Sequence, residues 1–133
     1  MTDDLMTIRE MCDAFDVTPR TLRFYEQKEL LAPRRDGQKR LFTRRDRARL
    51  KLILRGKRFG FSLEEIRQLL DLYDAGDQQL AQLTRARDIA ETRLADMERE
   101  RAELDAAIAE LRDQLRWGAE MIASLKTPRD AAE

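Results

Sequence analysis

The sequence has no histidine, and its only cysteine is Cys12. Histidine is the commonest general base and metal ligand, and a single thiol can form neither an internal disulfide nor a zinc site. The two serines, Ser62 and Ser124, have no base partner nearby in sequence. These absences argue against an enzyme, and we expect no metal and no other cofactor.

Long apolar runs and aromatic residues are also scarce. No segment approaches the roughly 18 consecutive apolar residues that a membrane span needs, and residues 1–9 contain no signal-peptide core. We therefore expect a cytoplasmic protein that does not bind membranes. Aromatic residues make up 6% of the 133 residues and charged residues 39%. This composition favours a mainly α-helical fold over a β-sandwich or a β-barrel.

The net charge of zero hides two regions of opposite sign. Residues 1–75 carry a net charge of +4 and residues 76–133 a net charge of −4. Within the first region, residues 18–58 hold 15 basic and 4 acidic side chains, a net charge of +11. Such a cluster is typical of a surface that contacts nucleic-acid phosphates, although an ordinary solvated face is the alternative.

The basic region contains two closely spaced helix-start signals. Thr7 with Glu10 forms a capping box in front of apolar residues at helical spacing. Thr18 followed by Pro19 marks the start of a second helix, predicted over residues 19–27. Only residues 15–17 separate the two helices, with Asp16 able to adopt a left-handed backbone. This pattern predicts a helix-turn-helix motif.

A hairpin and two more helices follow in the sequence. Asp36-Gly37 is a strong signal for a hairpin turn, and we expect residues 33–42 to form a basic β-wing. Thr43 with Asp46 predicts a third helix that stops between Gly56 and Gly60, and Ser62 with Glu65 predicts a fourth. We place the boundary of the DNA-binding domain at residue 75.

The rest of the chain has the pattern of a coiled coil. From Leu80 to Leu125, 14 positions spaced alternately by three and four residues include 11 apolar ones, which is a heptad repeat. A single helix cannot bury so narrow a stripe, so we expect a homodimer. We predict a dimerisation helix over residues 76–126 and a flexible tail over residues 127–133. The apolar seam positions are Leu80, Leu83, Ala90, Leu94, Met97, Leu104, Ile108, Leu111, Leu115, Ile122 and Leu125.

Several residues keep more than one interpretation. One of Phe24 and Tyr25 packs inside the domain and the other faces the DNA groove or a phosphate, and either assignment is open. Arg87 and Arg101 on the seam either set the register or extend to solvent. Trp117, Gly118 and Met121 line a small-molecule pocket, loosen the seam locally, or pack on the DNA-binding domain. Cys12 is expected to be a core residue.

The motifs together resemble the MerR family of bacterial transcription regulators. The resemblance rests on segments 6–11, 17–26, 30–33, 40–42 and 60–70, which occur in the order typical of that family. It implies a winged helix-turn-helix domain, an antiparallel coiled-coil homodimer and a palindromic promoter with a long spacer. It also implies that the bound dimer distorts this spacer to control RNA polymerase, often in response to an effector.

The resemblance also implies which residues contact double-stranded DNA. The second helix would direct its exposed side chains toward the major groove, the wing would grip the flanking backbone, and the end of the third helix would contact phosphates. These residues are Thr18, Arg20, Thr21, Arg23 and Tyr25; Arg34, Arg35, Lys39, Arg40 and Phe42; and Arg55, Lys57 and Arg58.

The chain departs from the family pattern in its sensor. Metal-responsive members carry cysteines near both ends of the dimerisation helix, and this sequence has none there, so metal sensing is not expected. No segment after residue 126 is long enough for an appended ligand-binding domain, so the effector is undetermined. The alternative function is a coiled-coil adaptor whose basic domain docks an acidic protein or RNA polymerase itself.

Overall fold

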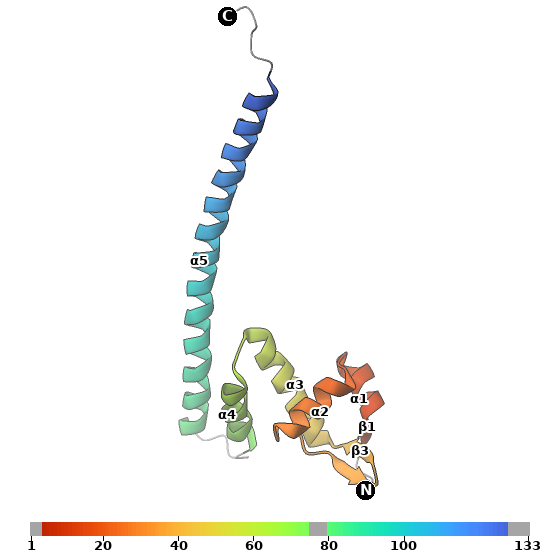
Figure 1. Cartoon of the computed structure of the whole chain (residues 1–133). Coiled ribbons are helices and arrows are strands. Elements are labelled where there is room, and N and C mark those ends of the chain that lie inside the picture. The colour runs from red at the N-terminus through yellow and green to blue at the C-terminus, as the bar shows by residue number, and fades with distance from the viewer. Residues whose placement is uncertain (1–3, 75–79, 128–133) are drawn as a thin grey trace, which may run out of the picture. The chain divides into compact units, whose positions relative to one another are not determined.

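The computed structural model describes residues 4–74 and 80–127 (Figure 1). The described chain is mainly helical, with a small sheet and one long helix, as the predicted fold class requires. The elements are β1 (Met6–Thr7), α1 (Ile8–Phe15), α2 (Pro19–Gln27), β2 (Arg34–Asp36), β3 (Lys39–Phe42), α3 (Arg44–Phe59), α4 (Leu63–Asp74) and α5 (Leu80–Lys126). The expected boundary between residues 75 and 76 and nearly all of the expected tail lie outside the described residues.

The helices begin where the sequence predicts. Thr7 accepts a hydrogen bond from the backbone N–H of Glu10, and the Glu10 carboxylate accepts one from the N–H of Thr7. The same reciprocal bonds join Ser62 and Glu65 at the start of α4. Asp16 ends α1 with a φ of 54°, so the left-handed turn between α1 and α2 is confirmed. These ends form locally because each cap satisfies amides that have no partner inside the helix.

The wing belongs to a three-stranded antiparallel sheet with the order β1-β3-β2. The hairpin of β2 and β3 is confirmed, with Arg35 opposite Arg40 and Asp36 opposite Lys39. Strand β1 was not predicted from the sequence; it pairs Met6 with Phe42 on the other edge of β3. A two-residue strand has too little alternation to be recognised from sequence. Through β1 the wing is attached to the start of α1.

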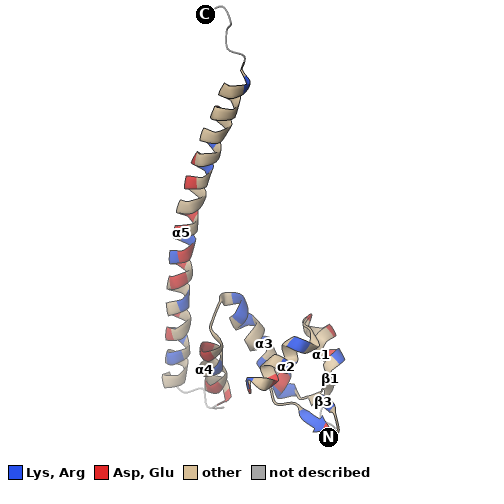
Figure 2. Ribbon diagram, viewed as in Figure 1, with Lys and Arg blue, Asp and Glu red and all other residues tan. Residues whose placement is uncertain are grey.

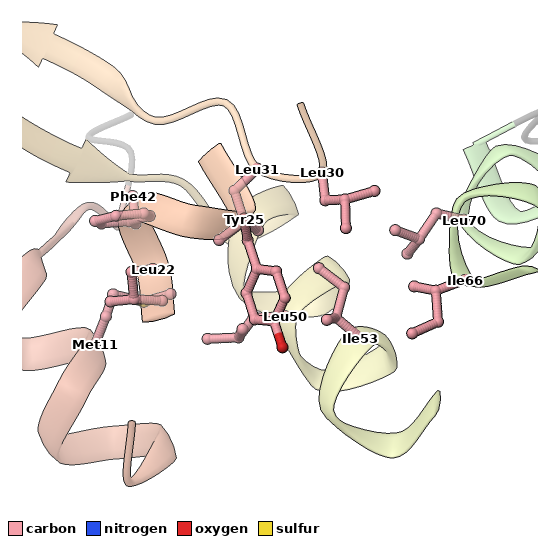
Figure 3. Packing of buried hydrophobic residues seen from close by; sticks show 10 residues of the cluster. All are labelled: Met11, Leu22, Tyr25, Leu30, Leu31, Phe42, Leu50, Ile53, Ile66 and Leu70. Atoms are coloured by element: carbon pink, nitrogen blue, oxygen red, sulfur yellow. The ribbon is translucent and has the colours of Figure 1, made fainter. Parts of the chain in front are cut away.

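One hydrophobic cluster holds α1 to α4 and the sheet together (Figure 3). Its side chains come from α1, α2, the segment after α2, β3, α3 and α4. Gly56 lies inside α3, and close packing explains why it is a glycine, since a Cβ atom there would come within 2.9 Å of Ile66 in α4. Cys12 packs against the cluster, as expected, and burial raises the pKa of its thiol. The buried residues are Met11, Leu22, Tyr25, Leu30, Leu31, Phe42, Leu50, Ile53, Ile66 and Leu70.

Two buried charged side chains connect the loop after α2 to α3. Asp46 is 1% exposed, and its carboxylate accepts hydrogen bonds from the N–H of Ala32 at 2.9 Å and of Thr43 at 3.0 Å. Arg49 donates to the carbonyl of Leu30 at 2.7 Å and pairs with Asp74 at the end of α4. Buried charges are stable only when bonded in this way, and these bonds fix how α2 and the wing meet α3.

Helix α5 differs from all the others because none of its 47 residues is buried. At ~1.5 Å per residue it is about 70 Å long. The described chain forms two compact units, one up to Arg93 and one from Leu94 onward, so the helix contributes to both. No helix among the described residues combines the length and apolarity needed to cross a bilayer.

Candidate nucleic-acid interface

The exposed face of α2 presents the side chains that are expected to enter the major groove. Arg20 and Arg23 are exposed, because Leu22 takes the buried side of the helix. Thr18 caps the helix by accepting a hydrogen bond from the N–H of Thr21, and the hydroxyls of these two threonines lie 3.0 Å apart. Among the described residues, no acidic side chain forms an ion pair with Arg20 or Arg23. Their charges therefore point to solvent.

Tyr25 does not lie on this face, and its expected contact with DNA is wrong. The side chain is 3% exposed and packs in the core, where burial raises the pKa of its phenol. The neighbouring Phe24 is 40% exposed instead. The ammonium of Lys28 lies 5.7 Å from the centre of the Phe24 ring, so an aromatic ring and a cation share the surface of α2.

The wing carries four of the predicted basic residues. Arg34, Arg35 and Lys39 are exposed and Arg40 is half-buried. Phe42, in contrast, is fully buried at the end of β3, so the expectation that it grips the DNA backbone is wrong. Its position between the wing and the cap of α3 makes it an anchor for the hairpin rather than part of the surface.

Glu26 connects the wing to α2. Its carboxylate pairs with Arg35 at 2.8 Å and with Arg40 at 2.5 Å. Partial burial by itself would raise the pKa of Glu26, but the hydrogen bonds from Arg40 and Arg35 outweigh it and lower the pKa. Glu26 therefore stays ionised at neutral pH and holds the base of the wing against the end of α2.

The last turns of α3 supply the third basic group. Arg55, Lys57 and Arg58 are exposed. Cations at a helix C-terminus also interact favourably with its dipole, so these side chains would be stabilised there without DNA. Figure 2 shows Lys and Arg over α2, the wing and the end of α3, whereas Asp and Glu are frequent in α4 and interspersed along α5.

The predicted seam of α5 is exposed along its length in the single chain. Its side chains range from Met97 at 37% to Leu125 at 81% exposed. No described part of the chain covers the seam, so the residues predicted for dimerisation have the exposure that a coiled-coil partner would remove.

Two surface features were missed at the sequence level. Tyr25 follows the buried Leu22 by three residues and so shares its side of the helix, whereas Phe24 does not. This spacing could have decided between the two aromatic rings. The role of Glu26 had no such signal, because its partners Arg35 and Arg40 are 9 and 14 residues away in sequence.

Comparison with known proteins agrees with this arrangement. The family model described as "MerR HTH family regulatory protein" matches residues 6–72, and "MerR, DNA binding" matches residues 47–114. The chain is 37% identical over 100 residues to the HTH-type transcriptional regulator HmrR of Rhizobium leguminosarum bv. viciae. That match covers 74% of this chain and 75% of HmrR.

Solved structures are similar over most of the chain. The lead(II) complex of the transcription regulator PbrR691 from Ralstonia metallidurans CH34 is 31% identical, with a TM-score of 0.66 over 84% of this chain and 86% of that one. HiNmlR, a regulator that lacks the sensor domain and was solved bound to promoter DNA, is 23% identical, with a TM-score of 0.65. That match covers 93% of this chain and 97% of HiNmlR, and at this identity it supports the fold alone.

Proposed function

Because the chain belongs to the MerR family of transcription regulators, we propose that it is a sequence-specific DNA-binding protein that controls transcription. The observation that carries this proposal is the surface of α2. Two arginines, Arg20 and Arg23, project from a helix that follows a tight turn, and no acidic group of the described chain neutralises them. A helix with an exposed cationic face is the kind of element that direct readout of the major groove uses.

The wing supports the same proposal. Arg34, Arg35 and Lys39 are exposed on β2 and β3, and Glu26 holds this hairpin against α2 through Arg35 and Arg40. A helix in the groove and a basic hairpin beside it would contact bases and flanking phosphates together. Phosphate contacts supply affinity and position, whereas the helix supplies sequence preference.

The proposed DNA-binding unit is an antiparallel homodimer joined through α5. A two-fold dimer reads a palindrome, because each protomer meets an identical half-site. The family implies that the palindrome lies in a promoter spacer and that the dimer distorts it so that RNA polymerase can engage the promoter. Bending of this kind costs of order 1–10 kcal/mol, and contacts from α2 and the wing on both half-sites would offset it.

We propose that this protein does not respond to lead(II), the ion that is bound in the PbrR691 structure. The chain has a single cysteine, Cys12, which lies in α1 rather than near either end of α5. Thiolate ligands for a soft metal at the dimer interface would therefore have to come from elsewhere. We propose a cytoplasmic, nucleoid-associated regulator without catalytic activity, whose effector, if it has one, is a small molecule other than a thiol-bound metal.

The decisive experiment is a footprint on the promoter fragments that the purified protein selects from genomic DNA. Arg20→Ala and Arg23→Ala should each lower affinity for the selected site by about 1–3 kcal/mol and relax its sequence preference. Arg116→Ala, an exposed arginine on α5, is the matched control and should bind normally. If both α2 variants kept wild-type affinity and footprint, the proposed interface would be wrong. Absence of any complex at low salt would favour the adaptor alternative.

A further inference from the structure

Gly118 is an anomaly inside α5. Glycine is among the weakest helix formers, so one in the middle of a long helix needs a reason. Its φ is not in the left-handed region, and a Cβ atom built on it would meet nothing within 4 Å. Among the described residues, therefore, neither backbone conformation nor steric contact requires glycine at this position.

Arg87 is a second anomaly on the same stripe. It occupies a seam position where the neighbouring ones hold Leu83 and Ala90. Its side chain is 76% exposed and pairs with Glu91 one turn later at 2.8 Å. A charged side chain at a seam position lowers the stability of a coiled coil, but it can specify how the two helices align.

A parallel dimer would make both anomalies costly. In a parallel coiled coil each seam residue faces its own copy, so Arg87 would face Arg87 of the partner subunit and Gly118 would face Gly118 of the partner subunit. The first layer would place two like charges together, and the second would leave a void. An antiparallel dimer instead brings different residues into each layer.

One antiparallel register uses every seam position. If Leu80 of one chain faces Leu125 of the partner subunit, each seam position has a partner in the other chain. The two-fold axis of the dimer then passes between Arg101 and Leu104. In this full-overlap register, Arg87 faces Gly118 of the partner subunit. A shift by one heptad in either direction leaves two seam positions of each chain without a partner. Arg87 then faces Leu111 after a shift in one direction and Leu125 after a shift in the other.

We propose, on the basis of the homodimer proposed above, that Arg87 of each chain packs over the bare backbone of the partner subunit at Gly118 and thereby selects the full-overlap antiparallel register. Glycine leaves room for the aliphatic part of Arg87 to cross the partner helix. The guanidinium then remains at the edge of the seam, where Glu91 of its own chain already binds it. Two-fold symmetry places this contact near both ends of the coiled coil.

Side-chain sizes near the same layer agree with the register. Ala90 faces Leu115 of the partner subunit, so a small residue meets a large one one layer inward. On the flank of the seam, Ala86 lies beside Met121 of the partner subunit, which gives Met121 a place in the interface although it is outside the heptad stripe. Next to the layer of Arg87 and Gly118, small residues thus face large ones, which favours close packing there.

Disulfide trapping tests the register directly. In a Cys12→Ser background, Leu94→Cys with Leu111→Cys should give a covalent dimer on a non-reducing gel, because these positions share a layer. They lie ~25 Å apart along one helix, too far for a bond within the chain. Leu94→Cys with Leu104→Cys, and Met97→Cys with Leu115→Cys, report the two shifted registers and should not cross-link. Leu94→Cys alone reports a parallel pair and should not cross-link either.

The outcomes separate this inference from the function on which it rests. Cross-linking of a shifted-register or single-cysteine variant would overturn the inference while leaving the dimer intact. A monomeric mass for the wild-type chain in sedimentation at micromolar concentration would overturn both the dimer and its register. Cross-linking of only the Leu94→Cys, Leu111→Cys variant supports the register.

A size swap tests the contact between Arg87 and Gly118. Gly118→Leu improves helix propensity, yet it should raise the dimer dissociation constant at least tenfold because the new side chain meets Arg87. Adding Arg87→Ala should restore the constant to within about threefold of wild type, whereas adding Arg101→Ala should not. If Gly118→Leu strengthened the dimer, or if Arg87→Ala failed to rescue it, the contact would be refuted.

Discussion

The two regions of this protein bury their apolar side chains in different ways. Helices α1 to α4 and the sheet close around one core, in which ten hydrophobic residues are almost completely inaccessible. Helix α5 has a regular apolar stripe but no buried residue. The first region can bury its apolar side chains within one chain, whereas α5 can bury its apolar stripe only by pairing with another helix.

This difference matches the division of charge. The basic side chains gather on the self-contained region, where they can be held in a fixed geometry for a polyanion. The acidic excess lies on the region that we expect to pair with a second copy. Reading and assembly are thus separable physical tasks in this chain, and substitutions should be able to disrupt one without the other.

The largest expected effect is the loss of assembly through Ile108→Asp, because Ile108 faces the apolar Met97 of the partner subunit in the full-overlap register. The carboxylate would enter the seam twice in a dimer, and we expect a cost of at least about 4 kcal/mol, roughly a thousandfold in the dissociation constant. Sedimentation should then give a monomer, and circular dichroism should show partial loss of helix as α5 loses its partner. Ala109→Asp, on the outer side of the same turn, should remain dimeric. A dimeric Ile108→Asp variant would contradict the proposed seam.

A smaller effect is expected inside the self-contained region from its two adjacent aromatic rings. Tyr25→Ala should lower the free energy of unfolding by about 3–4 kcal/mol, because it empties a site in the core. Phe24→Ala should cost less than about 1 kcal/mol, since Phe24 is 40% exposed. Urea unfolding of both variants measures the difference. Equal losses of stability would mean that the two rings share the core.

The smallest expected effect concerns the surface link between wing and α2. Glu26→Gln removes the ion pairs with Arg35 and Arg40 and should lower the free energy of unfolding by about 1–2 kcal/mol. It also frees Arg35 and Arg40 to approach DNA. The slope of log affinity against log salt concentration should therefore become steeper, by an amount equal to up to about one additional phosphate contact. Glu29→Gln, an exposed neighbour, is the control. An unchanged salt dependence would show that these arginines do not approach DNA.

The pH dependence of the Glu26 link follows from its lowered pKa. A carboxyl group with a lowered pKa stabilises the folded state above the ordinary glutamate pKa of about 4.3. That contribution is lost as the pH falls through the lower pKa of the folded state. The difference in stability between wild type and Glu26→Gln should therefore be constant near neutral pH and disappear in acid.

Local signals in the sequence determined most of the secondary structure. The caps formed by Thr7, Thr18, Thr43 and Ser62, the left-handed Asp16 and the Asp36-Gly37 turn are all confirmed. Each involves residues no more than a few positions apart, so the hydrogen bond or backbone conformation that it encodes does not depend on the rest of the fold. The heptad positions from Leu80 to Leu125 all lie within α5, and the predicted end at residue 126 matches the end of that helix. Residues 76–79 of the predicted helix lie outside the described residues.

Only the tertiary structure decided which of the candidate interface residues reach the surface. Tyr25 and Phe42 are buried because they pack in a core to which six segments of the chain contribute. Strand β1 forms because Met6 pairs with a residue of β3 that is distant in sequence. The two ion pairs of Glu26 join residues that are separated in the chain and meet only after folding. Periodicity and capping are properties of neighbouring residues, whereas burial and ion pairing depend on what the remainder of the chain brings alongside.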